Sequence, residues 1–208
     1  MIDEQADMYS YAAQMLERYG YHQYEISNFA AAGFESRHNL KYWRLDDYMG
    51  FGPGAHSCVG NLRYSFIKDL RRYTYGVSRK TSIIDEYEEI DPLERSVEYL
   101  MLGMRTNYGI EEQEYRTHCQ SDWKPVYRVL QAFQEKGWAV EENGRWHFTV
   151  SGFLISNTLI GILLEAQAGA RFDTTPWMYR SDEPKKDLKL PKGEQELFAE
   201  MYQKATRF

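Results

Sequence analysis

One histidine with aromatic and basic neighbours is the most reactive-looking group in the sequence. His38 is followed by Asn39, and then by Tyr42 and Trp43 four and five residues on, so one of the two rings could share a face with the imidazole. A neutral imidazole nitrogen can bind a metal ion, and aromatic rings can stack on a flat ligand. The alternative is that His38 and Asn39 only hydrogen-bond the surrounding loop.

Three cations surround this histidine: Arg37, Lys41 and Arg44. A guanidinium can donate two parallel hydrogen bonds to a carboxylate, so these side chains could anchor an acidic ligand.

A glycine-bearing segment follows, Gly50-Phe51-Gly52-Pro53-Gly54-Ala55-His56-Ser57. Glycine permits positive φ and lets the backbone approach a ligand closely. No GK[ST] follows and the spacing is not GxGxxG, so a nucleotide loop is unsupported. A tight turn explains the segment equally well, and a structural role is the first interpretation for His56.

Cysteine provides no metal site. Cys58 and Cys119 are the two cysteines of the chain, and neither belongs to a CxxC or CxxxCxxC motif, which zinc and iron–sulfur sites use. Two isolated thiols favour a reducing cytoplasm.

Charge and hydropathy exclude several classes of protein. The 208 residues carry a net charge of −6, which disfavours nucleic acid as a partner. We expect no membrane-spanning segment, because no apolar run reaches eighteen residues. The acidic N-terminus does not resemble a signal peptide.

The first ninety residues predict one α/β unit and an irregular region. Apolar spacing predicts a helix over 3–19, and alternation predicts a strand over 24–29. We expect residues 30–57 to form a long structured loop, followed by a strand over 61–67 and a short helix over 69–75. A single α/β unit is too little for a barrel, so we expect either another fold or a chain that begins inside a larger domain.

The next part has a different pattern. Asp91 and Pro92 predict a helix start, and this helix should reach about Arg105. A short helix after Ile110 and a helix over 123–136 follow. The Asn143-Gly144 turn then predicts a hairpin, and a last apolar helix should cover 152–166. Three helices and a hairpin are typical of a winged-helix arrangement.

Residues 169–208 form a more polar extension, in which 194–204 could be a terminal helix. We therefore divide the chain into 1–90, 91–168 and 169–208, and we predict a mixed α+β or α/β fold.

Three blocks together resemble a known family: residues 24–57, LMLGMRTNYGI, and FTVSGFLISNTLIGILL. They are similar to the C-terminal portion of the radical-SAM oxygen-independent coproporphyrinogen III oxidase family. The HNxxYW pattern resembles its haem-chaperone branch, HemW, more than the oxidase branch. The resemblance covers about residues 1–166.

The resemblance implies a partial barrel followed by the winged-helix-like part. Complete members hold a [4Fe–4S] cluster and S-adenosylmethionine on a CxxxCxxC loop that this sequence lacks. We therefore expect no catalytic residue and no resident cofactor in this chain alone, which would be either a fragment or a truncated product.

The resemblance also assigns residues. It implies haem or porphyrin binding by the HNxxYW region, with His38 as an axial ligand of the iron. It implies that a second group of residues lines the cofactor or substrate cavity. For Glu25, which belongs to this group, the preferred interpretation is a structural carboxylate paired with an arginine. The implied haem-binding residues are Arg37, His38, Asn39, Tyr42, Trp43 and Arg44. The implied cavity residues are Glu25, Gly52, Pro53, Gly54, Ala55 and His56.

Four functions remain open. The first is haem binding and transfer to haem-accepting proteins, and the second is oxidative decarboxylation of coproporphyrinogen III by the full-length protein. The third is a winged-helix DNA regulator, which the charge of −4 over residues 91–166 disfavours (seven bases, eleven acids). The fourth is an inactive remnant whose exposed barrel edge could form a homodimer.

Overall fold

The computed structural model describes residues 2–119 and 121–169, without the side chains of residues 2 and 3. Two compact units divide the chain, Met1–Thr174 and Thr175–Phe208, and every described residue belongs to the first. The predicted helix over 194–204 and nearly all of the polar extension lie outside the described residues. The elements in chain order are α1 (Ile2–Arg18), β1 (His22–Glu25), β2 (Asn28–Ala30), α2 (Arg37–Trp43), β3 (His56–Val59), β4 (Leu62–Phe66), α3 (Leu70–Arg79), β5 (Ile84–Glu89), α4 (Pro92–Gly103), β6 (Ile110–Glu111), α5 (Glu112–His118), α6 (Trp123–Glu135), β7 (Ala139–Glu142), β8 (Arg145–Phe148), α7 (Val150–Leu154) and α8 (Ser156–Gly169).

The N-terminal helix forms as predicted, but the strand after it does not. Residues 22–30 make two short antiparallel strands, β1 and β2, instead of one strand over 24–29. The chain turns at Ile26 and Ser27, where the Ser27 N–H donates to the Glu25 carboxylate at 3.1 Å. Alternating residue types did not reveal this turn, because the side chain that stabilises it belongs to the strand itself.

The predicted loop over 30–57 is wrong in two places. Helix α2 lies inside it, and β3 begins at its end. Strand β3 pairs with β4, and β4 pairs with β5, giving a three-stranded antiparallel sheet in the order β3-β4-β5. Strand β5 was not predicted, because acidic residues dominate its sequence IDEYEE.

Helix α3 is longer than predicted. It starts at an Asp69 cap, whose carboxylate accepts the Arg72 N–H at 2.8 Å, and it continues to Arg79. Lys80 then adopts a left-handed conformation at φ 55° and ends the helix.

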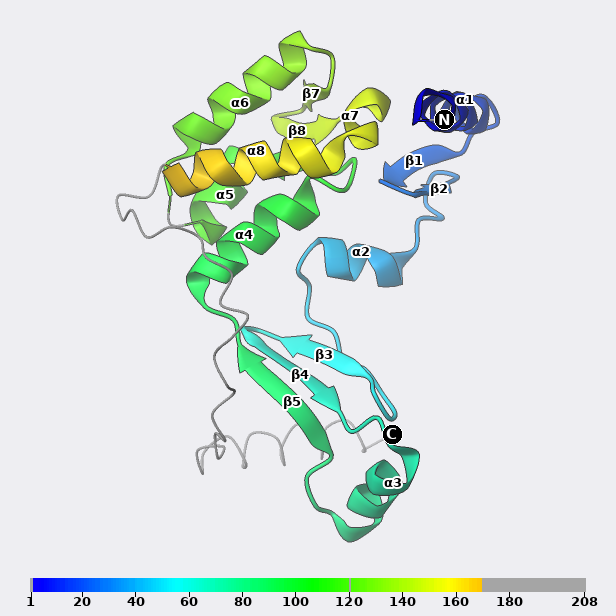
Figure 1. Cartoon of the computed structure of the whole chain (residues 1–208), viewed down its shortest axis with the longest axis vertical. Helices are drawn as coiled ribbons and strands as arrows, with labels where there is room; N and C mark the ends of the chain where they lie inside the picture. Colours follow the sequence, from blue (N-terminus) through cyan, green and yellow to red (C-terminus); the bar gives the residue numbers. More distant parts are fainter. Residues whose placement is uncertain (1, 120, 170–208) are drawn as a thin grey trace. The chain divides into compact units, whose positions relative to one another are not determined.

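The winged-helix-like arrangement is confirmed. Asp91 caps α4 by accepting the N–H groups of Leu93 and Glu94, with Pro92 in the first turn. The order α4, β6, α5, α6, β7, β8 follows, and the strands form a sheet in the order β6-β8-β7. Figure 1 shows α4, α5, α6 and α8 gathered around this small sheet.

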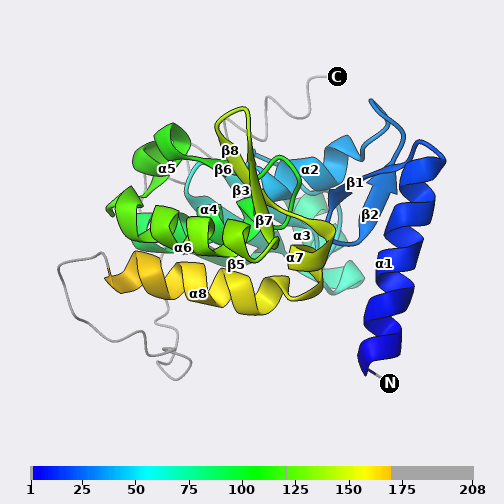
Figure 2. The same ribbon diagram turned by 90° about the horizontal axis from the view of Figure 1, so that it is seen from above.

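The last predicted helix is two helices. Thr149 caps α7 by accepting the Gly152 N–H at 3.2 Å, and the chain leaves helical geometry at Ile155 before α8 begins. Gly152 is needed at this point, because a Cβ there would lie 2.0 Å from the Trp138 carbonyl oxygen. In Figure 2, α8 runs alongside α6, which it contacts.

One hydrophobic core dominates the described residues. Its buried members all fall between Tyr99 and Leu163, and they come from α4, β6, α5, α6, β7, β8, α7 and α8 and from the turns between them. The sheets are open and antiparallel and none closes a barrel, so the α+β class is confirmed. No helix among the described residues is long and apolar enough to cross a bilayer.

Candidate functional site

Helix α2 carries the HNxxYW motif on an open surface. The Ser36 hydroxyl caps it by accepting the Asn39 N–H at 3.3 Å, and none of the seven helical residues is buried. His38 is exposed, so its ring is accessible to a ligand. Asn39 and Trp43 are half-buried, and Arg37 and Lys41 are exposed.

His38 and Tyr42 interact one helical turn apart. The Tyr42 hydroxyl lies 3.1 Å from His38 Nε2, and the two rings meet edge to face with centroids 5.0 Å apart. This hydrogen bond orients the imidazole and engages Nε2, one of the two ring nitrogens that can bind a metal ion. The pair has the four-residue spacing that the sequence suggested.

Tyr48 joins this pair to the neighbouring sheet. Its ring lies 4.5 Å from that of Tyr42, and its backbone exchanges hydrogen bonds with Cys58 in β3 at 2.8 and 2.9 Å. Burial raises the pKa of the Tyr48 hydroxyl, and the nearby Cys58 adds to the effect. Tyr48 therefore connects α2 to β3, through its ring on one side and through its backbone on the other.

Four exposed apolar side chains accompany the motif in sequence. Phe34 is 83% exposed and Phe51 is 78% exposed, and Tyr42 and Met49 are also open to solvent. Large apolar groups this exposed commonly mark a binding surface. The sequence motifs did not single out Phe34, Tyr48, Met49 or Phe51, although the density of aromatic residues in this segment was an available signal.

Arg44 has a different neighbour from the one expected. Its guanidinium lies over the Tyr108 ring, 4.8 Å from the centroid. Tyr108 also carries the Arg145 guanidinium at 3.7 Å. Arg44 thus links the end of α2 to the winged-helix part, whereas Arg37 and Lys41 form no ion pair within the described residues.

The glycine-bearing segment is a turn that leads into β3. Gly52 and Gly54 have φ of 98° and 72°, and Gly50 leaves no room for a Cβ, which would lie 2.4 Å from the His56 carbonyl oxygen. The Gly54 N–H donates to the Ile67 carbonyl, and the Ala55 carbonyl accepts from Phe66. These bonds account for the glycines structurally, and a cavity-lining role remains a prediction.

The remaining predicted residues are dispersed. Pro53 and His56 are exposed, and His56 pairs with Ser65 at the start of β3. Glu25 is 2% exposed and bridges to Thr106 through the backbone, and no arginine pairs with it among the described residues. Among the described residues, Glu25 makes no hydrogen bond or ion pair with His38 or with residues 52–56.

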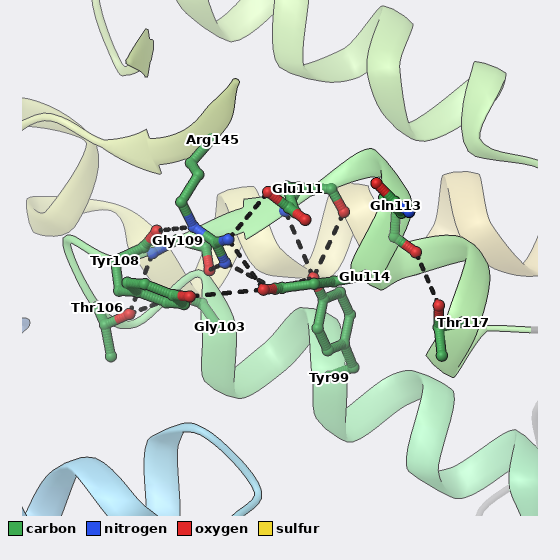
Figure 3. A network of polar contacts seen from close by, with 10 residues as sticks. All are labelled: Tyr99, Gly103, Thr106, Tyr108, Gly109, Glu111, Gln113, Glu114, Thr117 and Arg145. Carbon is green, nitrogen blue, oxygen red and sulfur yellow. Dashed lines mark hydrogen bonds and ion pairs between the residues drawn. The ribbon is translucent and has the colours of Figure 1, made fainter. Parts of the chain in front are cut away.

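A second polar cluster is centred on Arg145 in the wing, by which we mean the β7-β8 hairpin (Figure 3). Arg145 from β8 forms ion pairs with Glu114 at 2.7 Å and with Glu111 at 3.1 Å, and its side chain donates to the Tyr108 carbonyl at 2.9 Å. The hydrogen bonds from Arg145 lower the pKa of Glu114 despite its partial burial. Burial raises the pKa of Tyr99, whose hydroxyl contacts Glu114 at 3.0 Å. All of these groups are paired, so the cluster stabilises the fold.

The chain does not fit an iron–sulfur cluster. Its two cysteines are both buried. Cys119 lies in the core cluster, and Cys58 lies in β3, where its sulfur is 3.8 Å from Nη2 of Arg95 in α4. Among residues 2–119 and 121–169, no three His, Cys, Asp or Glu side chains are grouped to hold a metal ion.

Several known proteins are similar to this chain in sequence. Residues 90–155 match the HemN C-terminal domain family. A Bacillus subtilis protein named "Heme chaperone HemW" is 32% identical over 163 residues, which cover 78% of this chain and 43% of that protein. A Bos taurus protein named "Radical S-adenosyl methionine domain-containing protein 1, mitochondrial" is 33% identical, over 82% of this chain and 41% of its own. The chain thus spans about two fifths of the length of these relatives.

One solved structure is also similar. The coproporphyrinogen III oxidase HemN from Escherichia coli, described as a radical SAM enzyme, aligns with a TM-score of 0.55. The alignment covers 74% of this chain and 39% of the enzyme, at 13% sequence identity. At that identity the similarity concerns the fold alone.

Proposed function

This chain corresponds to the C-terminal portion of the radical-SAM coproporphyrinogen III oxidase family, and on that premise we propose that it serves haem binding and transfer. The matches to proteins named haem chaperones support this function. The observation that carries it is an exposed histidine held by a tyrosine on an open, ring-rich surface.

The proposed site is His38 with the rings and cations near it in sequence. An imidazole nitrogen is a competent axial ligand of haem iron, and exposed rings such as Phe34 and Phe51 can cover a porphyrin face. Arg37 and Lys41 are available to the propionates. Arg44 is a weaker candidate, because its guanidinium already lies over Tyr108.

The Tyr42 hydroxyl makes the proposal specific. It occupies His38 Nε2, so iron can bind that nitrogen only when this hydrogen bond breaks. Tyr42 therefore orients the ring and also competes with the iron. Such a ligand would be released more readily than a free imidazole, which suits a protein that transfers its haem.

A haem titration of the full chain, followed by the Soret band, tests this site. His38→Ala should weaken binding at least tenfold, and Tyr42→Phe should strengthen it, because Nε2 becomes free. His22→Ala is the matched control, since His22 is also exposed but pairs with Glu17 beside α1. Equal affinities of His38→Ala and the unsubstituted chain would remove His38 as the ligand.

We propose a second role for complete family members only. The structural similarity to an oxidase leaves porphyrinogen decarboxylation open for a longer protein, in which a [4Fe–4S] cluster and S-adenosylmethionine would supply the radical. This chain holds no residues for that cluster. Porphyrinogen turnover by a full-length, cluster-reconstituted protein would favour the oxidase, and haem transfer without turnover would favour the chaperone.

We propose haem-accepting proteins as partners and the cytoplasm as the location. The acidic winged-helix part argues against nucleic acid, because a phosphate-binding surface needs a basic stripe. A homodimer through an edge of the open β3-β4-β5 sheet is a further expectation, because a strand edge can pair with a second copy of a chain. Sedimentation of the purified chain would test the dimer.

A further inference from the structure

Positive charge is concentrated at helix α3. Residues 68–80 contain five cations and one acid, a net charge of +4, so the rest of the chain carries −6 − 4 = −10. The acid, Asp69, is already engaged as the helix cap. The five cations are Lys68, Arg71, Arg72, Arg79 and Lys80.

A hollow lies between α3 and the segment that follows it. Its volume is about 350 Å³, and the residues that line it are Ile67, Arg71, Arg72, Tyr75, Gly76, Thr81 and Ser82. Gly76 brings the helix against residues 81–83, because a Cβ there would lie 2.7 Å from Ile83 Cγ2. The Thr81 N–H donates to the Gly76 carbonyl at 3.0 Å and fixes this wall.

The two arginines of the hollow are unpaired. Within the described part of the chain, neither the Arg71 nor the Arg72 side chain forms an ion pair or a hydrogen bond. Other arginines differ: Arg63, Arg95 and Arg145 each bind carboxylates. Two arginines that line one hollow without a counter-ion among the described residues favour an external anion.

Hydroxyl and apolar groups complete the lining. Thr81 and Ser82 supply hydroxyl groups, and the Ser82 hydroxyl can still donate while it accepts the Ile84 N–H at 3.3 Å. Ile67 and the largely exposed Tyr75 ring supply apolar surface. The hollow therefore combines donors for an anion with a surface for a hydrophobic body.

We infer that this hollow binds a small organic anion, whose carboxylate or phosphate group meets Arg71 and Arg72 and whose ring lies against Tyr75 and Ile67. Its volume is near the lower limit of ligand pockets, roughly 300 Å³, so it suits a single ring and not a tetrapyrrole. The site shares no residue with α2 and stands independently of the haem proposal.

Titration of the full chain with phenyl phosphate and, separately, benzoate tests the site. Backbone amide shifts of Gly76, Thr81 and Ser82 in NMR spectra should saturate with at least one of the two ligands. Tighter binding of phenyl phosphate identifies a phosphate site, and tighter binding of benzoate identifies a carboxylate site. Inorganic phosphate should bind more weakly, because it lacks the ring.

The double variant Arg71→Ala/Arg72→Ala should weaken binding at least tenfold. Arg128→Ala, an exposed α6 residue whose loss also removes a positive charge, should leave it unchanged. The amide spectrum outside residues 67–83 reports whether the double variant keeps its fold, and haem titration of it should be unaffected. Absence of saturable shifts at millimolar ligand, or equal weakening by Arg128→Ala, would overturn the inference.

Discussion

The winged-helix part, from α4 to α8, and the segment from α2 to β5, residues 37–89, are stabilised in different ways. The first buries aromatic and aliphatic side chains from eight helices and strands around one core. In the second, the buried apolar side chains of the described structure are Cys58 and Tyr64. Its order depends on strand pairing, on ring contacts and on the ion pair that Arg63 in β4 forms with Glu98 in α4.

This contrast indicates that the winged-helix part provides a rigid support and that the segment from α2 to β5 provides the binding surface. The well-packed part pairs Arg145 with Glu111 and Glu114, whereas the other part exposes His38, Phe51 and the cations of α3. Segments with few buried apolar contacts open at lower cost, so the candidate sites lie where the chain adjusts most easily. Substitutions in the two parts should therefore differ in the size of their effects.

Core truncation should show the largest difference. Leu130→Ala removes a side chain that is 0% exposed and should lower the unfolding free energy by about 3 kcal/mol. Leu70→Ala, at a site 63% exposed, should change it by less than about 0.5 kcal/mol. Urea unfolding measures both, and comparable losses would mean that the two parts are packed alike.

Glycine substitutions should have the next largest effects on stability. They separate the cost of a steric clash with a neighbouring backbone from the cost of backbone strain. Gly109→Ala combines φ +66° with a Cβ placed 2.0 Å from the Trp146 carbonyl oxygen, and should cost about 3 kcal/mol. Gly137→Ala has φ +72° with nothing within 4 Å, so strain alone should cost about 1 kcal/mol. Equal melting temperatures of the two variants would contradict the close packing of the wing.

Loss of the ion pairs that Arg145 forms should lower the unfolding free energy by an intermediate amount that depends on pH. Arg145→Met should cost about 2 kcal/mol at neutral pH, because Glu114 and Glu111 lose their partner. Arg145 holds the pKa of Glu114 below its ordinary value of 4.5. The stabilisation is therefore present above pH 4.5 and is lost as pH falls toward the lower pKa of the folded state.

Glu114→Gln should accordingly flatten the acid side of the stability profile in urea unfolding. Glu112→Gln is the control, since its pair with Arg116 is more than half exposed on both sides and should contribute little. An unchanged acid limb in Glu114→Gln would show that the pair does not determine acid stability.

The smallest effect concerns the connection between the two parts. Tyr108→Ala removes the ring under Arg44 and Arg145 and should cost about 1 kcal/mol, while Tyr108→Phe keeps the ring and most of the stability. Hydrogen exchange of the Leu40 and Arg44 amides in α2 should accelerate in the alanine variant only. Identical exchange in both variants would mean that α2 is held by Tyr48 and not by this contact.

Local chemistry predicted much of the winged-helix part. Asp91 with Pro92, the Asn143-Gly144 turn and Gly137 after α6 act within a few residues, so their consequences can be derived from sequence. The same reasoning missed β3 and β5 and the break at Ile155. Strand β5 depends on pairing with β4 across α3, and Gly152 before the break contacts the Trp138 carbonyl. Strand β3 is joined to β4 by the short turn at Gly60 and Asn61, so for this strand a local signal was present and was not used.

The candidate site shows the same division. The four-residue spacing of His38 and Tyr42 predicted a shared face, because helical geometry alone brings such side chains together. Spacing did not reveal that Tyr48 would join them, that Arg44 would turn to Tyr108, or that Glu25 would be buried without an arginine.

The sequence by itself determined the caps, the turns, the net charge, the absence of a cluster motif and the presence of a histidine-centred motif, because each depends on residue type or short-range spacing. Only the tertiary structure decided that Arg44 meets Tyr108, that Glu25 is buried beside Thr106 and that Arg63 pairs with Glu98, because these contacts join residues far apart in the chain that packing brings together.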